Sequence, residues 1–266
     1  MLSMRVDLGG RRIIKTTKED TTKLNNCNIS IRIDDEFMLD VRQNSHYGLG
    51  FRVKETDEFI MKIVSAKQLF HKICELNHKG AEPGILFWDK ITKHNILEHD
   101  PTFSLAGVNP CAEEPLPAGG SCLLGALNLS EFVTNPFTEE AQFDYDDFAL
   151  AVKVAVEGLN EVLDEGLELH PLEIQKQSVG DWRQIGLGIM GLADCLIKLG
   201  LTYGSESANK FCNELAFTLF RESVQASESL GKALGSYDKY DPQCVNKSKM
   251  LQKAGIVTNH LRNSQL

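Results

Sequence analysis

The sequence predicts an α/β fold. Short runs rich in β-branched residues alternate with longer runs whose apolar residues recur at helical spacing. The strand-like runs gather in the first half of the chain, whereas the second half is mostly helical. We place the most natural boundary at the Asn135-Pro136 turn, between a strand and helix part over 1–135 and a mainly helical part over 136–266. At 266 residues and 42% hydrophobic content, the chain can bury a substantial core in one large or two small domains.

Short strands are expected early in the chain. Met4–Asp7 and Ile29–Ile33 alternate polar with apolar side chains and are rich in β-branched residues. Gly84–Trp88 is a continuous apolar run of the kind found in buried strands, and Ser104–Val108 is expected to be extended. These segments account for the β part of the predicted fold.

The longest helix of the first half is predicted over 57–77. Its apolar residues fall at helical spacing, acidic residues stand at its start, and Gly80 follows its end. In the second half, apolar stripes and N-terminal capping residues predict helices over 145–164, 185–199, 205–230 and, more briefly, 248–254.

Composition narrows the possible partners. The formal net charge of −9 argues against broad binding to nucleic acid or to anionic membranes. No apolar run is long enough to cross a bilayer, and charged residues interrupt any signal-peptide core in the first twenty positions. Seven cysteines without a framework spacing indicate a reducing, cytoplasmic setting.

One segment concentrates the chemistry of the chain. It reads Asn109-Pro-Cys111-Ala-Glu113-Glu-Pro-Leu-Pro-Ala-Gly-Gly-Ser-Cys122. If its backbone is extended, Asn109, Cys111 and Glu113 point to the same side, because alternate residues share a face. A small pocket would then receive an amide, a sulfur and a proton acceptor. The Pro- and Gly-rich stretch before Cys122 is able to fold the chain back toward Cys111.

Other interpretations of this segment are weaker. Cys111 stands between Pro110 and Ala112, outside any apolar run, so core burial explains it poorly. No C-x-x-C pair exists, and the histidines lack carboxylates at coordinating positions, so we expect no metal site. A cysteine-nucleophile hydrolase would need a histidine that only the fold can place. Redox or radical sulfur chemistry fits two thiols and a carboxylate best.

Two further patterns are assigned structural roles. Gly186-Leu-Gly188-Ile-Met-Gly191 matches G-x-G-x-x-G, but the residues before it do not resemble a parallel strand, so we expect close helix packing instead of a nucleotide cradle. Three cysteines fall within helical apolar patterns and are expected in the core: Cys74, Cys195 and Cys212.

The cysteine segment resembles the active-site segment of the large, catalytic chain of ribonucleotide reductase. The resemblance extends over nearly the whole chain. It includes 28–37, Gly-Ile-Leu-Phe-Trp-Asp89, Gly186–Asp194 and Leu-Arg-Asn-Ser-Gln-Leu266. It implies a ten-stranded α/β barrel made of two antiparallel halves, with a central finger loop that carries the radical cysteine.

The resemblance also implies residue roles. Cys111 would become the thiyl radical that abstracts the 3′ hydrogen of the ribose, and Glu113 would accept the 3′-hydroxyl proton. Asn109 would hydrogen-bond the substrate. Cys122 would be one of two thiols that supply electrons and close to a disulfide. We prefer Glu113 to Glu114 as the base because alternation turns Glu114 away from Cys111.

The implied reaction is reduction of ribonucleotides, expected as diphosphates, to 2′-deoxyribonucleotides. Cys111 would be oxidised either by adenosylcobalamin (class II) or by a separate metal-radical subunit (class I). The Asn-Pro-Cys sequence slightly favours adenosylcobalamin. A thioredoxin-like protein would be the reductant.

Compared with the family, the chain looks like an internal fragment. The partner of Cys122 and the effector loops would lie upstream of Met1, and the phosphate loop and a cysteine-bearing tail would follow Leu266. Partners would therefore include the missing N- and C-terminal parts. The alternative is a truncated or split non-catalytic fragment that is inactive alone.

Overall fold

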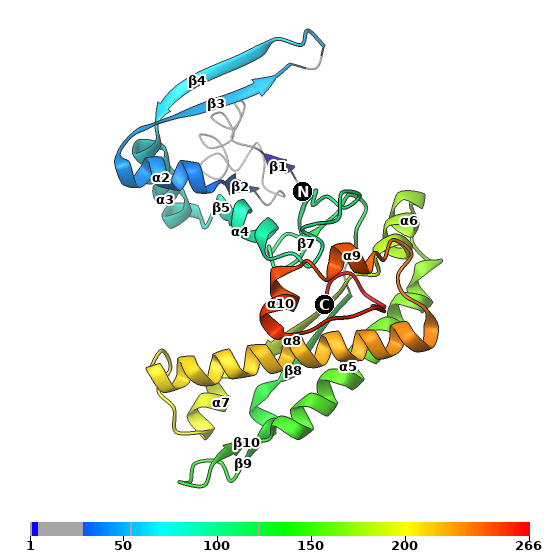
Figure 1. Ribbon diagram of the computed structural model, residues 1–266. Coiled ribbons are helices and arrows are strands. Elements are labelled where there is room, and N and C mark those ends of the chain that lie inside the picture. The colour runs from blue at the N-terminus through cyan, green and yellow to red at the C-terminus, as the bar shows by residue number, and fades with distance from the viewer. Residues whose placement is uncertain (1, 5–28, 54, 122) are drawn as a thin grey trace. The chain divides into compact units, whose positions relative to one another are not determined.

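The computed structural model describes residues 2–4, 29–53, 55–121 and 123–266 (Figure 1). The predicted α/β class is confirmed, because parallel strand pairs alternate with helices. The chain forms two compact units, one of residues 1–94 and 105–115, the other of residues 95–104 and 116–266. Asn135 and Pro136 lie inside the second unit, so the division between the units does not fall at that turn.

The first unit is built on a parallel sheet with the strand order β1-β2-β5. The prediction for 29–33 is confirmed by β2, and the buried run by β5. Of the strand expected over 4–7, Met4 ends β1 and the rest lies outside the described residues. The elements of this unit are β1 (Leu2–Met4), β2 (Ile29–Ile33), α2 (Asp35–Gln43), β3 (His46–Arg52), β4 (Phe59–Ser65), α3 (Ala66–Gly80), β5 (Gly84–Phe87), α4 (Trp88–Lys93) and β6 (Gly107–Val108).

The helix predicted over 57–77 is wrong in its first part. Phe59–Ser65 forms β4, which pairs antiparallel with β3 from Phe59↔Arg52 to Ser65↔His46. Only then does α3 begin, with the Ser65 hydroxyl accepting a hydrogen bond from the Gln68 N–H at 3.4 Å. Cross-strand pairing outweighs the local helical spacing here, and the capping serine marks the true start of the helix.

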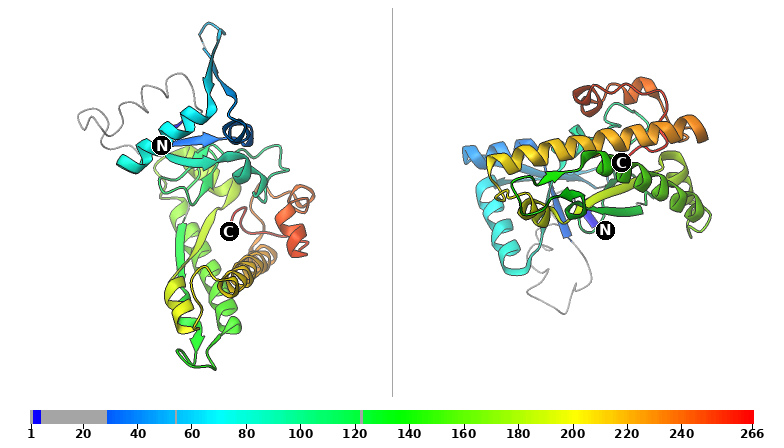
Figure 2. Two further views of the ribbon diagram at one scale, coloured as in Figure 1. Left: turned by 90° about the vertical axis from the view of Figure 1, so that its left-hand side faces the viewer. Right: turned by 90° about the horizontal axis from the view of Figure 1, so that it is seen from below.

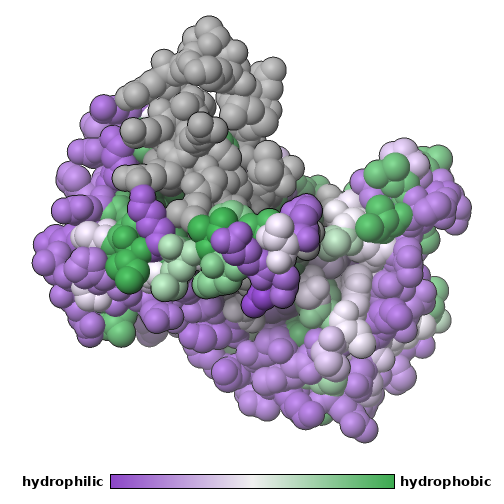
Figure 3. Space-filling view, turned by 90° about the horizontal axis from the view of Figure 1, so that it is seen from above, coloured by the Kyte–Doolittle hydropathy of each residue, from purple (hydrophilic) through white to green (hydrophobic). Residues whose placement is uncertain are grey.

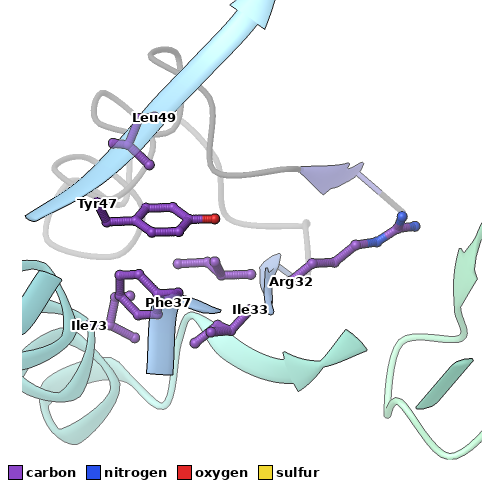
Figure 4. Close-up of a pocket in the computed structure, with 7 residues that line it drawn as sticks. Arg32, Ile33, Phe37, Tyr47, Leu49 and Ile73 are labelled. Atoms are coloured by element: carbon purple, nitrogen blue, oxygen red, sulfur yellow. The ribbon is translucent and has the colours of Figure 1, made fainter. Parts of the chain in front are cut away.

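A small apolar pocket lies between β2, α2, β3 and α3 (Figure 4). The Tyr47 ring stands edge-on to Phe37, with 5.1 Å between the ring centroids. The Tyr47 hydroxyl donates to Asp34, the N-cap of α2, at 2.7 Å. Burial, and then this hydrogen bond to a carboxylate, raise the pKa of Tyr47. These contacts fix α2 and β3 around β2.

The second unit centres on β8 and β11, which pair in parallel from Leu123↔Ile185 to Asn128↔Met190. The helix α5 contacts both strands and also the long helix α8, and Figure 2 shows α5 and α8 lying side by side. The elements of this unit are β8 (Leu123–Asn128), η1 (Leu129–Phe132), β9 (Val133–Thr134), β10 (Gln142–Phe143), α5 (Tyr145–Leu167), α6 (Glu173–Trp182), β11 (Ile185–Met190), α7 (Leu192–Lys198), α8 (Glu206–Leu234), α9 (Pro242–Val245) and α10 (Lys249–Ala254). The strand β7 (Pro115–Leu116) joins the two units along the chain.

The helix predicted over 185–199 is also wrong in its first part, because Ile185–Met190 is the strand β11. The glycine motif therefore does not serve helix packing. Gly188 faces the β8 backbone, where an added Cβ would lie 3.7 Å from the Gly125 carbonyl oxygen. Gly191 has φ +70° and would clash with the Asn128 side chain if it carried a Cβ. Gly191 allows the turn into α7.

The three cysteines expected in the core differ in burial. Cys195 is fully buried, which confirms the prediction, and burial raises the pKa of its thiol to about 11. Cys212 is half-buried, whereas Cys74 is exposed on α3, so that prediction is wrong. Cys74 follows the buried Ile73 and lies on the outer face of the helix.

The described surface is largely hydrophilic in the view of Figure 3, with hydrophobic residues in separate patches. One exposed apolar row follows β4, where Phe59, Met61 and Ile63 alternate along the strand. Among the helices that the structure describes, none combines the length and apolar character needed to cross a membrane.

A buried polar network holds the end of the second unit. Asn160 on α5 and Asn263 exchange amide hydrogen bonds, each 3.0 Å long. The guanidinium of Arg183, which is 5% exposed, donates to Asn160 at 3.2 Å and pairs with Asp164. Arg262 also pairs with Asp164, at 3.4 Å. The network thus ties α5 to the start of β11 and to the segment 261–265.

Asp164 makes the stability of the folded protein at acid pH depend on this network. Burial tends to raise the pKa of Asp164, but hydrogen bonds and charge from Arg183 and Arg262 outweigh it and lower the pKa. A carboxylate with a lowered pKa contributes stability above its unfolded pKa of about 3.9, and this contribution is lost as pH falls through the folded value. We expect Asp164→Asn to lower the free energy of unfolding at pH 7, and the gap to the wild type to close below pH ~4.

Urea denaturation from pH 7 to pH 3 measures this gap. Glu161→Gln is the control, because Glu161 is exposed on the same helix, and its effect should be small at every pH. A gap for Asp164→Asn that stays constant down to pH 3 would contradict the assignment.

Candidate active site

The thiol Cys111 lies on a closed turn between β6 and β7. The Asn109 N–H donates to the Glu114 carbonyl at 3.1 Å, and the Ala112 N–H donates to the Asn109 carbonyl at 3.1 Å. These bonds close the loop at its base and again at its tip. The backbone is therefore not extended, which was the condition for Asn109, Cys111 and Glu113 to share a face, because backbone hydrogen bonds within the loop replace those of a strand.

The Asn109 side chain fixes this turn. Its Oδ1 accepts a hydrogen bond from the Glu114 N–H at 2.9 Å. The side chain thus bridges the two ends of the turn, a role that we did not predict from the sequence. A signal for it existed, because asparagine side chains readily accept from backbone amides in turns, and Asn-Pro favours turns.

The tip of the turn adopts an uncommon backbone conformation. Ala112 has φ +72°, in the left-handed region that side chains other than glycine rarely occupy. Such a conformation costs on the order of 1–3 kcal/mol and persists where the surroundings fix it. It reverses the chain directly between Cys111 and Glu113.

Exposure distinguishes the residues of the turn. Cys111 and Glu113 are exposed, while Asn109 and Glu114 are half-buried. Because the backbone is not extended, alternation no longer supports Glu113 over Glu114. Exposure now does, since Glu113 is open to an approaching hydroxyl and the Glu114 backbone is bound to Asn109 at both its N–H and its carbonyl.

Cys122 lies outside the described residues. Before it, the Gly120 N–H donates to the Pro117 carbonyl at 3.0 Å, which forms a turn. Gly119 has φ +73°, and an added Cβ would lie 2.6 Å from the Ile174 carbonyl oxygen, so only glycine fits there. After it, Leu123 begins β8. A meeting of Cys122 with Cys111 stays a prediction.

Two of the described histidines have partners close in the sequence. His71 pairs with Glu75 at 3.3 Å, and the His94 Nδ1 lies 2.8 Å from the Lys90 carbonyl oxygen. Within the described ranges, no three side chains of the His, Cys, Asp and Glu types are grouped so as to hold a metal ion.

Comparisons with known proteins identify relatives of the chain. The family model described as "Ribonucleotide reductase, barrel domain" matches residues 12–263. The vitamin B12-dependent ribonucleoside-diphosphate reductase of Thermoplasma acidophilum is 32% identical over 214 residues, covering 80% of this chain and 26% of that protein. The protein of the same name from Mycobacterium tuberculosis strain H37Rv is 30% identical over 240 residues, covering 90% of this chain and 32% of that protein.

A relative with a different name is also similar. The ribonucleoside-diphosphate reductase subunit alpha of Chlamydia pneumoniae is 28% identical over 207 residues, covering 73% of this chain and 19% of that protein. The chain therefore spans between a fifth and a third of the length of these three relatives.

Asn109 holds the turn and is also predicted to bind the substrate, and substitutions separate these two roles. Asn109→Asp keeps an oxygen that accepts from the Glu114 N–H, whereas Asn109→Leu removes the bridge. We expect Asn109→Leu to speed amide hydrogen exchange within 109–114 by about two- to tenfold, the effect of losing one ordinary hydrogen bond. Asn109→Asp should leave that exchange close to the wild-type rate.

Hydrogen-exchange mass spectrometry of peptides that cover the turn makes the measurement. Asn213→Leu, at an exposed position on α8, is the control for the substitution itself and should not affect the turn. Equal exchange in the wild type and Asn109→Leu would show that the Asn109 side chain does not hold the turn.

Proposed function

This chain belongs to the family of the ribonucleotide reductase barrel domain, and on that premise we propose that it carries the radical thiol of a ribonucleotide reductase. The observation that carries the proposal is the exposed thiol on a closed turn inside a segment that the family model covers. The ten-stranded barrel, with this turn as its finger loop, belongs to the same proposal. The activity is proposed for the complete polypeptide or assembly that contains the chain.

In the proposed reaction, Cys111 in its thiyl form takes the hydrogen atom from the 3′ carbon of the ribose. Glu113 accepts the proton of the 3′ hydroxyl, and the 2′ hydroxyl leaves as water. Two thiols, one of them Cys122, give two electrons and close to a disulfide. Cys111 then returns its hydrogen atom to the 3′ carbon. The sum is a ribonucleotide and two thiols giving a deoxyribonucleotide, a disulfide and water.

Asn109 takes a defined part in this proposal. Its Oδ1 accepts from the Glu114 N–H, and its Nδ2 group has two N–H donors that would serve a ligand. An amide nitrogen only donates hydrogen bonds, so Asn109 would bind an oxygen of the substrate as an acceptor. The ribose hydroxyl oxygens have that capacity.

The radical source is proposed to be adenosylcobalamin. The relatives from Thermoplasma acidophilum and Mycobacterium tuberculosis are named vitamin B12-dependent, although the relative from Chlamydia pneumoniae is not. When bound, this cofactor would supply the oxidising equivalent that converts a thiol to a thiyl radical. The exposed side chain of Cys111 fits oxidation by a group that comes from outside the turn. A thioredoxin-like protein is proposed to reduce the disulfide.

Substrates are proposed to be ribonucleoside diphosphates. The three relatives reported above carry that substrate in their names. The second candidate, a split or truncated piece that is inactive alone, is favoured by the share of the relatives that this chain spans. The mass of the native polypeptide separates the two: a mass well above 29.6 kDa supports an intact reductase, and one near 29.6 kDa supports a piece.

Cys111→Ser is expected to abolish nucleotide reduction while leaving nucleotide binding nearly intact. The reason is that a hydroxyl does not form the corresponding oxygen radical under conditions in which a thiol forms a thiyl radical. The measurement is conversion of a radiolabelled ribonucleoside diphosphate by the complete native polypeptide with adenosylcobalamin and a dithiol. Cys74→Ser, the same change at an exposed cysteine on α3, should keep full activity. Turnover by Cys111→Ser would remove the thiol from the mechanism.

Glu113→Gln is expected to lower the rate of reduction by roughly 10²- to 10⁴-fold, the usual contribution of a positioned base. Glu114→Gln is the matched control and should cost far less, because its neighbour keeps the carboxylate that faces the substrate. Folding of both variants is checked by circular dichroism. A rate for Glu113→Gln that equals that of Glu114→Gln would reject Glu113 as the base.

A further inference from the structure

Arg32 connects the central strand of the first unit to the segment that carries Cys111. It lies on β2, and its guanidinium carbon is 3.7 Å from the centroid of the Trp88 ring. Its Nη2 donates to the Ala106 carbonyl oxygen. Figure 4 shows the Arg32 side chain extending away from the apolar residues of the pocket. One side chain therefore joins β2, the start of α4 and the approach to β6.

Ala106 stands directly before β6, and the closed turn begins one residue after that strand. The hydrogen bonds of the turn described above are internal to it: they set its shape but not its place. The bond from Arg32 reaches outside the turn, to a strand of the sheet. It therefore contributes to where the Cys111 thiol lies.

The strand that carries Arg32 is a firm support. β2 is the middle strand of the order β1-β2-β5, and Ile29, Ile31 and Ile33 are buried on its inner face. Arg32 lies between two of these buried residues and projects to the other face. Strand pairing on both edges and burial of alternate residues hold its backbone in place.

Arginine suits this position for a physical reason. A guanidinium is planar, so its face stacks on the Trp88 indole while N–H groups at its edge point outward to donate. The Trp88 ring thus orients the group that binds the Ala106 carbonyl. A lysine would keep the charge and one donor but lose the flat stacking.

We propose that Arg32 is a positioning residue for Cys111. Arg32 acts through the Ala106 carbonyl, and the Trp88 ring holds its guanidinium. The proposal rests on the proposed function for its effect on turnover. A misplacement of a reacting group by about 1 Å can slow a reaction by about 10²-fold, whereas the phosphate groups of a nucleotide would be held by donors outside the turn. Loss of Arg32 should therefore lower kcat and leave KM nearly unchanged.

The test compares Arg32→Met, Arg32→Lys and Arg52→Met in the complete native polypeptide. Arg52 is the matched control, because it is an exposed arginine on β3 whose ion pair with Asp57, 3.0 Å long, lies within its own hairpin. Two readouts need no turnover: hydrogen exchange of peptides within 105–116, and the rate at which iodoacetamide alkylates Cys111, followed by peptide mass spectrometry. The third readout is the separation of kcat from KM.

We expect Arg32→Met to speed exchange within 105–116 by at least fivefold and to change the alkylation rate of Cys111, with an unchanged melting temperature. The value of kcat should fall at least tenfold, with KM within twofold of wild type. Arg32→Lys should restore part of each effect, and Arg52→Met should show none. Unchanged exchange and alkylation in Arg32→Met would overturn the proposal.

Failure of the proposed function gives a different pattern. If the wild-type protein does not reduce nucleotides, the exchange and alkylation readouts still decide whether Arg32 positions the turn. If Arg32→Met lowers the melting temperature and speeds exchange over the whole first unit, Arg32 has only a general structural role and the proposal is wrong. Trp88→Phe keeps an aromatic face for the Arg32 guanidinium. We expect its melting temperature to match that of the wild type, which gives an independent check on the stability of the first unit.

Discussion

Parallel pairing of strands that are distant in sequence is the constraint on which both units depend. In a parallel pair the chain must return to the same end of the sheet, and this return requires a long crossover. Between β2 and β5 the crossover contains two helices and the β3–β4 hairpin, and between β8 and β11 it contains α5 and α6. The pairing therefore decides where the helices lie.

The turn that carries Cys111 is ordered although it is exposed. A reactive thiol must be exposed, yet an exposed loop is usually mobile. Here internal hydrogen bonds replace burial as the source of order. The Asn109 side chain and the backbone N–H groups of Asn109 and Ala112 close the loop, and the left-handed Ala112 reverses the chain at its tip. The result is a thiol that is both accessible and held by local bonds.

The sequence predicted the class of fold better than the bounds of the elements and the shape of the turn. Helical spacing over 57–77 and 185–199 was real, but β4 pairs with the neighbouring strand β3 in a hairpin and β11 pairs with the distant strand β8, and the spacing of apolar residues reports neither pairing. The segment with Cys111 was singled out by its residue types, a thiol, an amide and a carboxylate, and its role as an active site stays a prediction. The closed shape of this turn was not predicted, because it depends on a hydrogen bond from the Glu114 N–H to the Asn109 side-chain oxygen. Arg32 carried no signal, since its partners Trp88 and Ala106 are brought to it only by folding.

Electrostatics constrain how a nucleotide would meet this turn. The chain has a formal charge of −9, and Glu113 and Glu114 stand two and three residues after Cys111, so negative charge at the turn disfavours phosphate groups there. A diphosphate would therefore be held at a distance from it, by donors in another part of the protein. In the proposed reaction the uncharged sugar would be the part of the nucleotide that meets the turn, with Asn109 as a donor, Glu113 as a proton acceptor and Cys111 as the thiol. The acidic character of the turn thus favours the orientation in which the ribose faces the sulfur.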